Sequence, residues 1–457
     1  MKKSLASGAG ASRELIEGPI WRGLLNFAFP IFLGNLFQQL YNTADTLIVG
    51  NFIDKQALAA VSSSGNLIFM IVGLLNGIAM GAGVVIAKFF GAKDEESMRR
   101  AIHTDIAFGL VGGLLLTAVG VAFTPHMLRW MGTPNDVLPN SILYFRTYFY
   151  GVLATFMYNI ATGILHAVGD SKHPLYYLIC ASVINVILDL LFVAVFKWGI
   201  ASAAAATVIS QFISASLALR RLMTVNDSCR VNPREIRFDI PILKSIVRLG
   251  LPSGVQNSVI GFANVMVQKN INIFESDAMA GCGSYAKIEG FAFLPVTCFV
   301  MALSTFVSQN LGAKQIDRVK KGTKFGVLCS MSAAAVISVI VFTCAPFLLR
   351  LFNDDPAVIA FGVKQAHIQS LFYCLLAFSH CMAGILRGAG KAYVPMAIML
   401  ICWCLIRVTY ITVTVNLFHE IGFVFSSYPI TWSLSSIIFL IYYLKADWVH
   451  GFEKKKA

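Results

Sequence analysis

Charged residues are scarce in this sequence: Asp, Glu, Lys and Arg together make up 13% of its 457 residues. Soluble globular domains carry about 25%. Hydrophobic residues reach 57%, and apolar runs long enough to cross a hydrocarbon layer, which takes about 20 residues, recur along the whole chain. The shortage of charge therefore excludes a soluble enzyme or binding module, and the composition indicates an integral membrane protein.

Motifs of several common chemistries are also lacking. The ten cysteines include no CxxC pair, which argues against disulfides and metal sites. The sequence has no nucleotide-binding glycine loop and no catalytic constellation, so we expect no enzyme activity and no resident cofactor. The acidic run 353–356 precedes a predicted helix, where capping explains it. The N-terminus carries Glu14 and Glu17 and lacks the apolar core of a signal peptide, so we expect it to stay on the mature protein.

The apolar runs that are present predict an all-α fold of twelve transmembrane helices. We place these spans at 24–50, 57–87, 101–124, 141–168, 175–196, 199–221, 246–273, 278–309, 322–350, 360–388, 394–418 and 421–444.

The positive residues between the spans lie mostly on one side. Of the 36 Lys and Arg residues, 27 fall before the first span, after even-numbered spans or in the C-terminal tail. The opposite loops hold Lys55, Arg129, Lys197 and Arg350. The positive-inside rule then places both termini in the cytoplasm of a multi-pass protein of the plasma membrane. The net charge of +13 is thus topological, and we expect no nucleic-acid partner.

The sequence contains an internal repeat. GILHAVGDSKHP at 163–174 recurs as GILRGAGKAYVP at 384–395, an offset of 221 residues, and the same offset pairs Gly91-Ala92-Lys93 with Gly312-Ala313-Lys314. Each copy holds six predicted spans, an even number, so the two copies have the same orientation. Parallel repeats of this kind occur in alternating-access transporters.

The repeat predicts two six-helix lobes around a central cleft. We expect a cytoplasmic N-terminal segment, an N-terminal lobe, a cytoplasmic linker, a C-terminal lobe and a basic cytoplasmic tail at 1–23, 24–223, 224–241, 242–445 and 446–457. Polar composition and Pro233 define the linker. With a one-residue slip in the offset, Pro30 pairs with Pro252 in the first helix of each lobe.

With these features in view, the sequence resembles the multidrug and toxic compound extrusion (MATE) family of antiporters over roughly residues 15–445. The resemblance depends on Pro30 with Asp45-Thr46 and Val49-Gly50, on Leu58-Ala59-Ala60, on Gly91-Ala92, and on the paired loops Gly163…Gly169-Asp170 and Leu386-Arg387-Gly388…Gly390. It implies export of organic cations and other amphipathic compounds in exchange for inward protons or sodium ions. The branch it resembles most is the DinF-like one, whose cation site lies in the N-terminal lobe.

The resemblance also implies site residues. A coupling-cation site would comprise Gln38, Asp45, Asn159, Asn185, Asp189 and Thr207. Pro30 matches a proline associated with bending of the first helix, for which a static kink is the alternative. Another branch has carboxylates on the seventh and tenth helices, but the runs 261–270 and 375–386 contain none. This difference argues against a coupling site of that kind in the C-terminal lobe.

Spacing supports the N-terminal site independently of the resemblance. Gln38 and Asp45 are seven residues apart and Asn185 and Asp189 are four apart, so each pair shares a helix face. A charge in hydrocarbon costs at least ~2.5 kcal/mol on insertion scales, which makes each aspartate a functional candidate. The alternative is that each one only hydrogen-bonds neighbouring helices and fixes their packing. Carboxyl groups can take up a proton, and oxygen ligands suit sodium, so both coupling ions stay open.

Charges also occur within the spans of the second half. Lys287 and Glu289 are two residues apart and point to different faces of an ideal helix, so each is expected to find another partner. They form a candidate polar site of the C-terminal lobe, with either structural pairing or a role in substrate binding or coupling. For Arg146 and Arg407 we favour a structural role.

The leading hypothesis is a secondary active, cation-coupled exporter of amphipathic or cationic small molecules, embedded in the lipid bilayer as a monomer. Its coupling ion is a proton or sodium. The alternative within transport is a lipid-linked oligosaccharide flippase of related fold, in which Lys269, Lys287 and Arg407 would hold a pyrophosphate. A non-transporting receptor or scaffold would need neither a carboxylate pair nor duplicated lobes.

Overall fold

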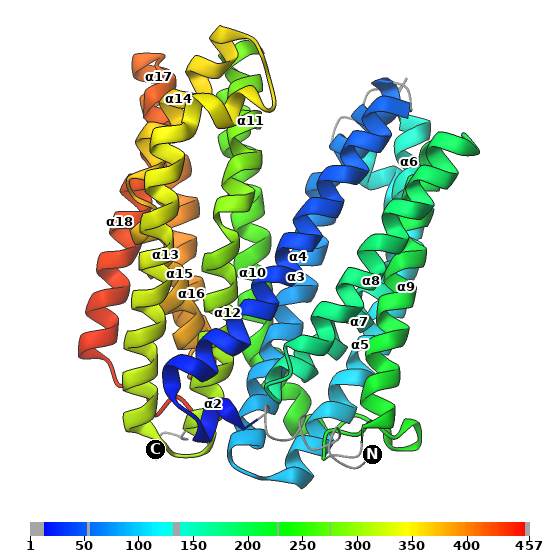
Figure 1. The fold of residues 1–457 in the computed structure, drawn as a ribbon, viewed down its shortest axis with the longest axis vertical. Helices are drawn as coiled ribbons and strands as arrows, with labels where there is room; N and C mark the ends of the chain where they lie inside the picture. The colour runs from blue at the N-terminus through cyan, green and yellow to red at the C-terminus, as the bar shows by residue number, and fades with distance from the viewer. Residues whose placement is uncertain (1–12, 53–54, 131–137, 226–227, 275, 453–457) are drawn as a thin grey trace. The chain divides into compact units, whose positions relative to one another are not determined.

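The computed structural model describes residues 13–52, 55–130, 138–225, 228–274 and 276–452. Every regular element in these ranges is helical (Figure 1), which confirms the all-α prediction. Residues 1–12 of the expected N-terminal segment and 453–457 of the expected tail lie outside the described residues. The elements are α2 (Glu14–Glu17), α3 (Ile20–Phe52), α4 (Lys55–Gly91), α5 (Glu95–Trp130), α6 (Leu138–Tyr150), α7 (Val152–Ala167), α8 (Lys172–Asp189), η1 (Leu190–Val195), α9 (Ile200–Thr224), η2 (Pro233–Glu235), α10 (Ile240–Ile271), α11 (Ser276–Ala292), α12 (Leu294–Gly312), α13 (Ile316–Arg350), α14 (Pro356–Ser370), α15 (Tyr373–Gly388), α16 (Tyr393–Met399), η3 (Leu400–Ile406), α17 (Arg407–Phe418) and α18 (Ile421–Lys445).

Many of these helices have the length and composition of membrane spans. Among the described residues, nine helices are long and apolar enough to cross a membrane, or up to eleven if each of two bent pairs forms one span. The bent pairs are α6 with α7, at 42°, and α14 with α15, at 57°. A further predicted span corresponds to α10, a 32-residue helix whose Gln256, Asn257 and Asn264 lower its hydropathy. The predicted span 278–309 is divided between α11 and α12.

The chain forms two compact units whose membership does not follow the two sequence halves. The first unit contains Leu33–Leu251, and the second contains Leu15–Phe32 together with the chain from Pro252. The segment 224–241, expected as a linker, belongs to the first unit. The beginning of the first long helix is therefore grouped with the C-terminal half. The lobes predicted at 24–223 and 242–445 place it in the N-terminal half instead.

Two helices, α3 and α10, change unit along their length. Each continues through an internal proline, Pro30 in α3 and Pro252 in α10. The unit boundary falls after Phe32 in α3 and directly before Pro252 in α10. An internal proline removes one helical hydrogen bond and permits a bend. Pro30 and Pro252 correspond to each other in the repeat. Each thus lies near the point where the first helix of its repeat passes from one unit to the other.

The beginning of α3 is buried in the second unit. Leu24 is fully buried there, and Phe27 and Ile31 join the same hydrophobic core. Preceding it, the backbone carbonyl of Leu15 accepts hydrogen bonds from Asn310 Nδ2 at 3.1 Å and from Arg318 Nη2 at 3.2 Å. Apolar burial and these bonds together explain why residues 15–32 belong to the second unit.

The beginning of α10 packs against α4 in the first unit through glycines. A Cβ atom on Gly250 would lie 2.7 Å from the Cα atom of Ile78, and one on Gly81 would meet the backbone of Gly250. The absence of side chains at both positions lets the two backbones touch, as small residues do in membrane helix pairs. This close approach fixes the first turns of α10 to the N-terminal half.

The backbone repeats its special conformations at the sequence offset. Lys93 and Lys314, 221 residues apart, both have positive φ, of 57° and 58°. Gly169 and Gly390 do likewise, with φ of 86° and 81°. Left-handed residues of this kind end helices, so the two halves close the same helices in the same way. The duplication seen in the sequence is therefore present in the structure.

Candidate functional site

Asp45 and Asp189 come together within the first unit. Asp45 lies on α3, seven residues before the end at Phe52, and Asp189 ends α8, six residues before the end of η1 at Val195. At ~1.5 Å per residue the two positions have similar depth. Their carboxyl groups are close enough to interact electrostatically with each other.

A change of helix type accompanies Asp189. The regular α-helix ends at this residue, and six residues of π-helix, Leu190–Val195, follow it. Single π-helical turns inside α-helices are frequent at functional sites, because they shift side chains out of the regular register. Asp189 is 0% exposed. The sequence of α8 thus places a fully buried carboxyl group where the helix widens.

The carboxyl pair receives little help from other hydrogen-bond donors. In the described part of the chain, the two carboxyl oxygens of Asp189 accept no hydrogen bond. Oδ1 of Asp45 accepts none either. Two neighbouring ionised carboxylates repel each other, whereas uptake of one proton relieves the repulsion. The arrangement therefore fits a pair that holds at least one proton.

Polar groups lie next to the pair on three helices. Asn185 precedes Asp189 by one turn, and its Nδ2 approaches the Thr207 hydroxyl at 3.5 Å, a long contact. Gln38 interacts with the Tyr41 hydroxyl. Carboxyl, amide and hydroxyl oxygen atoms thus occur on nearby turns of α3, α8 and α9. Such a set can bind a proton and also suits a hard cation such as sodium.

Two tyrosines of the site were not predicted from the sequence. The hydroxyl groups of Tyr41 on α3 and Tyr144 on α6 both interact electrostatically with Asp45 and Asp189. Tyr41 had a signal, because it lies three residues after Gln38 and four before Asp45 and so shares their face. Tyr144 had none, because α6 reaches the pair only through packing.

The remaining predicted residues lie apart from this contact set. The backbone carbonyl of Asn159 on α7 accepts a hydrogen bond from the Thr162 hydroxyl at 3.0 Å. Its side chain forms no hydrogen bond with the residues that the structure describes. Pro30 belongs to the second unit, fifteen residues before Asp45 on the same helix. The structure thus brings Asp45, Asp189, Asn185, Thr207 and Gln38 into one region and leaves Asn159 and Pro30 outside their contacts.

The carboxyl pair has no counterpart in the second repeat. The offset of 221 residues matches Asp189 to Tyr410, and the offset with its one-residue slip matches Asp45 to Val267. The shared architecture is therefore built without these charges in the second half. The fold therefore does not require Asp45 and Asp189, which makes a functional role the better explanation for them.

The second unit has its own buried charges. The guanidinium group of Arg407 is 2% exposed, donates to the Thr431 hydroxyl at 2.8 Å and lies 4.2 Å from the centre of the Tyr428 ring. Glu289 interacts electrostatically with Arg407, but no ion pair joins the two among the described residues. Lys287 points elsewhere, with its Nζ 5.5 Å from the centre of the Phe352 ring. The structure therefore does not bring Lys287 and Glu289 together.

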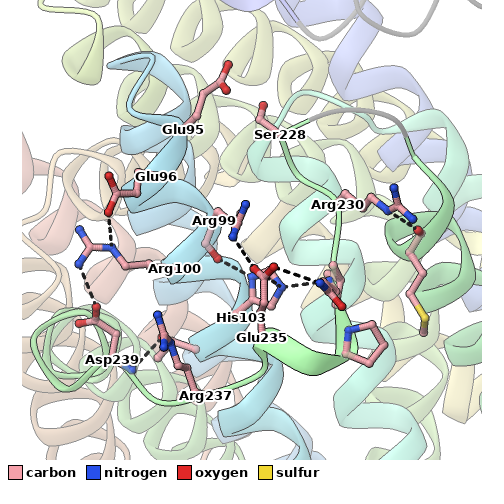
Figure 2. Close-up of a pocket in the computed structure, with 15 residues that line it drawn as sticks. Glu95, Glu96, Arg99, Arg100, His103, Ser228, Arg230, Glu235, Arg237 and Asp239 are labelled. Carbon is pink, nitrogen blue, oxygen red and sulfur yellow. Dashed lines mark hydrogen bonds and ion pairs between the residues drawn. The ribbon is translucent and has the colours of Figure 1, made fainter.

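A second polar region of the first unit is a pocket of about 1010 Å³ lined by the start of α5, by Met223 and by residues of the segment 228–239 (Figure 2). Arg99 pairs with Glu235 at 2.7 Å and Arg100 with Asp239 at 3.3 Å. His103 holds the segment too, because its Nε2 accepts the backbone N–H of Asn232 at 3.0 Å. These contacts fasten the segment 228–239 to α5.

Duplicated bundles of membrane-spanning helices, with a buried polar site in one bundle, define a polytopic membrane transporter. The chain belongs to the MatE family: the model of that family matches residues 30–191 and again residues 252–413. The two matches coincide with the two repeats.

Individual relatives agree with this assignment. The probable multidrug resistance protein YoeA of Bacillus subtilis is 28% identical over 433 residues, which cover 93% of each chain. The multidrug export protein MepA of Staphylococcus aureus is 22% identical and covers 84% of this chain and 85% of its own. A solved multidrug resistance MATE family transporter of the MOP superfamily, in its outward-facing conformation, superimposes with a TM-score of 0.90 at 20% identity, over 98% of this chain and 99% of its own.

Proposed function

We propose that this protein is a secondary active exporter of cationic or amphipathic small molecules, coupled to inward movement of protons or sodium ions. The observation that carries the proposal is the pairing of Asp45 with the fully buried Asp189 in a chain of the MatE family. Relatives named as multidrug resistance and multidrug export proteins, from Bacillus subtilis and Staphylococcus aureus, support the choice of substrate class.

In the proposed mechanism the carboxyl pair is the coupling element. A site can drive exchange only when its two states differ in affinity for the coupling ion and the substrate. With a cation bound, the pair is closer to neutral and tolerates burial. After the cation leaves, two carboxylates at close range and low exposure are unstable, which favours a conformation that opens them to water. The tyrosine hydroxyls of Tyr41 and Tyr144 can stabilise the ionised form by donating hydrogen bonds.

The proposed cellular setting is the plasma membrane, with both termini in the cytoplasm. This orientation depends on the strong bias of Lys and Arg toward one set of loops. The tightly fastened segment 228–239 carries Arg230, Arg234 and Arg237 and is assigned to the cytoplasmic side by the same rule. We further propose that the protein works as a monomer and without a bound cofactor.

The flippase alternative receives less support. It requires free cations for a pyrophosphate group, but the guanidinium group of Arg407 is buried and donates to Thr431 through Nε and Nη2. Tyr428 also covers it at 4.2 Å. A group already bonded in this way has little capacity left for a ligand. The export proposal is therefore preferred.

The proposal is tested with the purified full-length protein in liposomes. Proton and sodium gradients are imposed separately, and movement of a fluorescent organic cation is recorded. We expect one of the two gradients to drive uphill transport, and Asp45→Asn to abolish it. Asp94→Asn is the matched control, since Asp94 is an exposed carboxylate that bonds Ser97 in a loop turn. If neither gradient moves an organic cation, the export proposal is overturned.

A further inference from the structure

The segment 228–239 and the first turns of α10 carry more basic than acidic side chains. Five arginines and lysines lie between residues 228 and 248, against two acidic residues. Both acids are already paired with α5, since Glu235 contacts Arg99 at 2.7 Å and Asp239 contacts Arg100 at 3.3 Å. In this stretch of the described chain, the five cations are therefore left without a carboxylate partner.

Two of these cations share one exposed face of α10. Lys244 and Arg248 are both exposed, and a spacing of four residues places them one above the other on the helix. Neither side chain forms an ion pair or a hydrogen bond with the residues that the structure describes. The face continues at both ends into exposed apolar side chains, Ile240 at 67% and Leu251 at 45%. These four residues form the α10 stripe.

The opposite face of the same turns is packed. Ile242 and Ile246 are 8% and 0% exposed. Gly250 lies so close to α4 that a Cβ atom on it would be 2.7 Å from the Cα atom of Ile78. Asp239 caps the helix, because its Oδ1 accepts the N–H of Ile242 at 3.2 Å. These contacts fix the rotation of α10 about its axis, so the α10 stripe is held in one direction.

The order of side chains along the α10 stripe indicates which partner fits it. The apolar run predicted as a span begins at residue 246, so Lys244 and Arg248 lie at its boundary and Leu251 lies within it. Cations beside exposed apolar side chains are typical of helix turns at a membrane surface, where the charged ends reach the headgroups. At ~1.5 Å per residue the two cations are about 6 Å apart along the axis, so both can reach one phosphodiester group.

An acidic peptide or a free anion fits the α10 stripe less well. Either one would satisfy Lys244 and Arg248 but would leave Ile240 and Leu251 in water. A lipid supplies both parts, because its phosphate group meets the cations and its glycerol and acyl groups cover the apolar side chains. Clusters of basic residues next to a membrane-spanning helix favour anionic lipids over zwitterionic ones.

We propose that the α10 stripe is a binding site for an anionic phospholipid. The ammonium group of Lys244 and the guanidinium group of Arg248 bind the headgroup phosphate, and Leu251 contacts an acyl chain. The site lies directly before Pro252, where α10 passes from the first unit to the second. It is independent of the Asp45–Asp189 pair, and its test does not involve transport.

The test is native mass spectrometry of the purified full-length protein in a non-ionic detergent. The protein is titrated with phosphatidylglycerol, which is anionic, or with phosphatidylcholine of the same acyl chains, which is zwitterionic. We expect phosphatidylglycerol to bind more tightly. The double variant Lys244→Gln and Arg248→Gln should weaken its binding about 30-fold, at roughly fivefold for each cation, whereas Lys244→Arg should bind as wild type does. Equal affinities for the two lipids, or an unchanged affinity in the double variant, overturn the proposal.

A matched control separates a site from a general attraction of charge. Arg234→Gln with Arg237→Gln removes the same charge from exposed positions just before α10, off the α10 stripe. We expect this variant to lose clearly less affinity for phosphatidylglycerol than the stripe variant, and equal losses would overturn the site.

Competition separates the lipid from other anions. Inorganic phosphate and poly-glutamate are added at matched ionic strength, and neither should displace phosphatidylglycerol, because neither has an apolar part to cover Ile240 and Leu251. Displacement by phosphate would show a site for free anions, and displacement by poly-glutamate would show a site for an acidic peptide. Either result overturns the lipid proposal.

Discussion

The two units of this molecule bury different kinds of charged residue. The first unit buries carboxyl groups, with Asp105 and Asp189 at 1% and 0% exposure. The second unit buries Arg387 and Arg407, at 6% and 2%. Arginine stays charged at every physiological pH, whereas a carboxyl group can gain or lose a proton. The buried carboxyl groups of the first unit can therefore change their charge with a proton gradient, whereas these two arginines cannot.

The first prediction concerns Asp45. Asp45→Asn keeps nearly the same shape but cannot exchange a proton, so we expect gradient-driven efflux of a cationic dye to be abolished. Expression and melting temperature should stay close to wild type, because the neutral isostere removes a desolvation cost. Asp189→Asn should reduce efflux strongly as well. Normal efflux by Asp45→Asn would mean that this aspartate has a packing role alone.

The second prediction concerns Asp170, in the loop between α7 and α8. Burial raises its pKa, but the hydrogen bonds and charge of His173, whose Nδ1 lies 2.6 Å away, more than offset this and hold the pKa below its usual range. A lowered pKa stabilises the fold above the unfolded value, about 3.9, and this contribution is lost as the pH falls through the folded value. Asp170→Asn should therefore melt below wild type at neutral pH and converge with it in acid. A constant difference in melting temperature at all pH values would contradict this explanation.

Among the elements, α3 and α10 have the most unusual role, because each belongs to both units. Their proline residues permit the change of direction, and specific contacts hold the first turns in place. For α3 these contacts are apolar side chains such as Leu24 in the core of the second unit. For α10 they are the glycine contacts with α4. The first turns of both linking helices are thus fixed by packing.

The third prediction tests the glycine contact. Gly250→Leu introduces a side chain where a Cβ atom would already lie 2.7 Å from the Cα atom of Ile78. Overpacking typically costs about 1–3 kcal/mol, so we expect a clear fall in melting temperature and in yield of folded protein. Gly283→Leu on α11 is the matched control, since a Cβ atom there has nothing within 4 Å. Similar losses in the two variants would rule out the close approach as the cause.

At the scale of the whole molecule, a duplicated fold carries an unequal distribution of chemistry. The repeats share turn conformations at Gly169 and Gly390, but the carboxyl pair and Asp105 occur in the first copy alone. A transporter built in this way can couple ions in one half while the other half is free to differ in its buried surface. The membrane orientation then decides from which side each group meets water.

The fourth prediction concerns that orientation. Single cysteines at Asp354, Lys314 and Arg234 are placed in a background in which the exposed Cys180 and Cys344 are replaced by serine. The positive-inside rule predicts that an impermeant thiol reagent added to intact cells labels Asp354→Cys and leaves the other two unlabelled until the membrane is permeabilised. External labelling of Lys314→Cys or Arg234→Cys would show that the predicted orientation is wrong.

Local pattern determined much of this protein from its sequence alone. Apolar runs give the all-α fold, because hydrocarbon requires backbone groups to bond within each helix. The constant offset gives the duplication, and the seven- and four-residue spacings place Gln38 and Asn185 on the faces of Asp45 and Asp189. Asp355 caps α14 as expected, accepting the N–H of Ala357 at 2.9 Å.

Only the tertiary structure decided which groups meet across the chain. The approach of Tyr144 to the carboxyl pair, the bond between His103 and Asn232 and the division of α3 and α10 between units all join residues far apart in sequence. Periodicity reports which face of one helix is apolar, whereas such contacts depend on how the surfaces of several helices fit together.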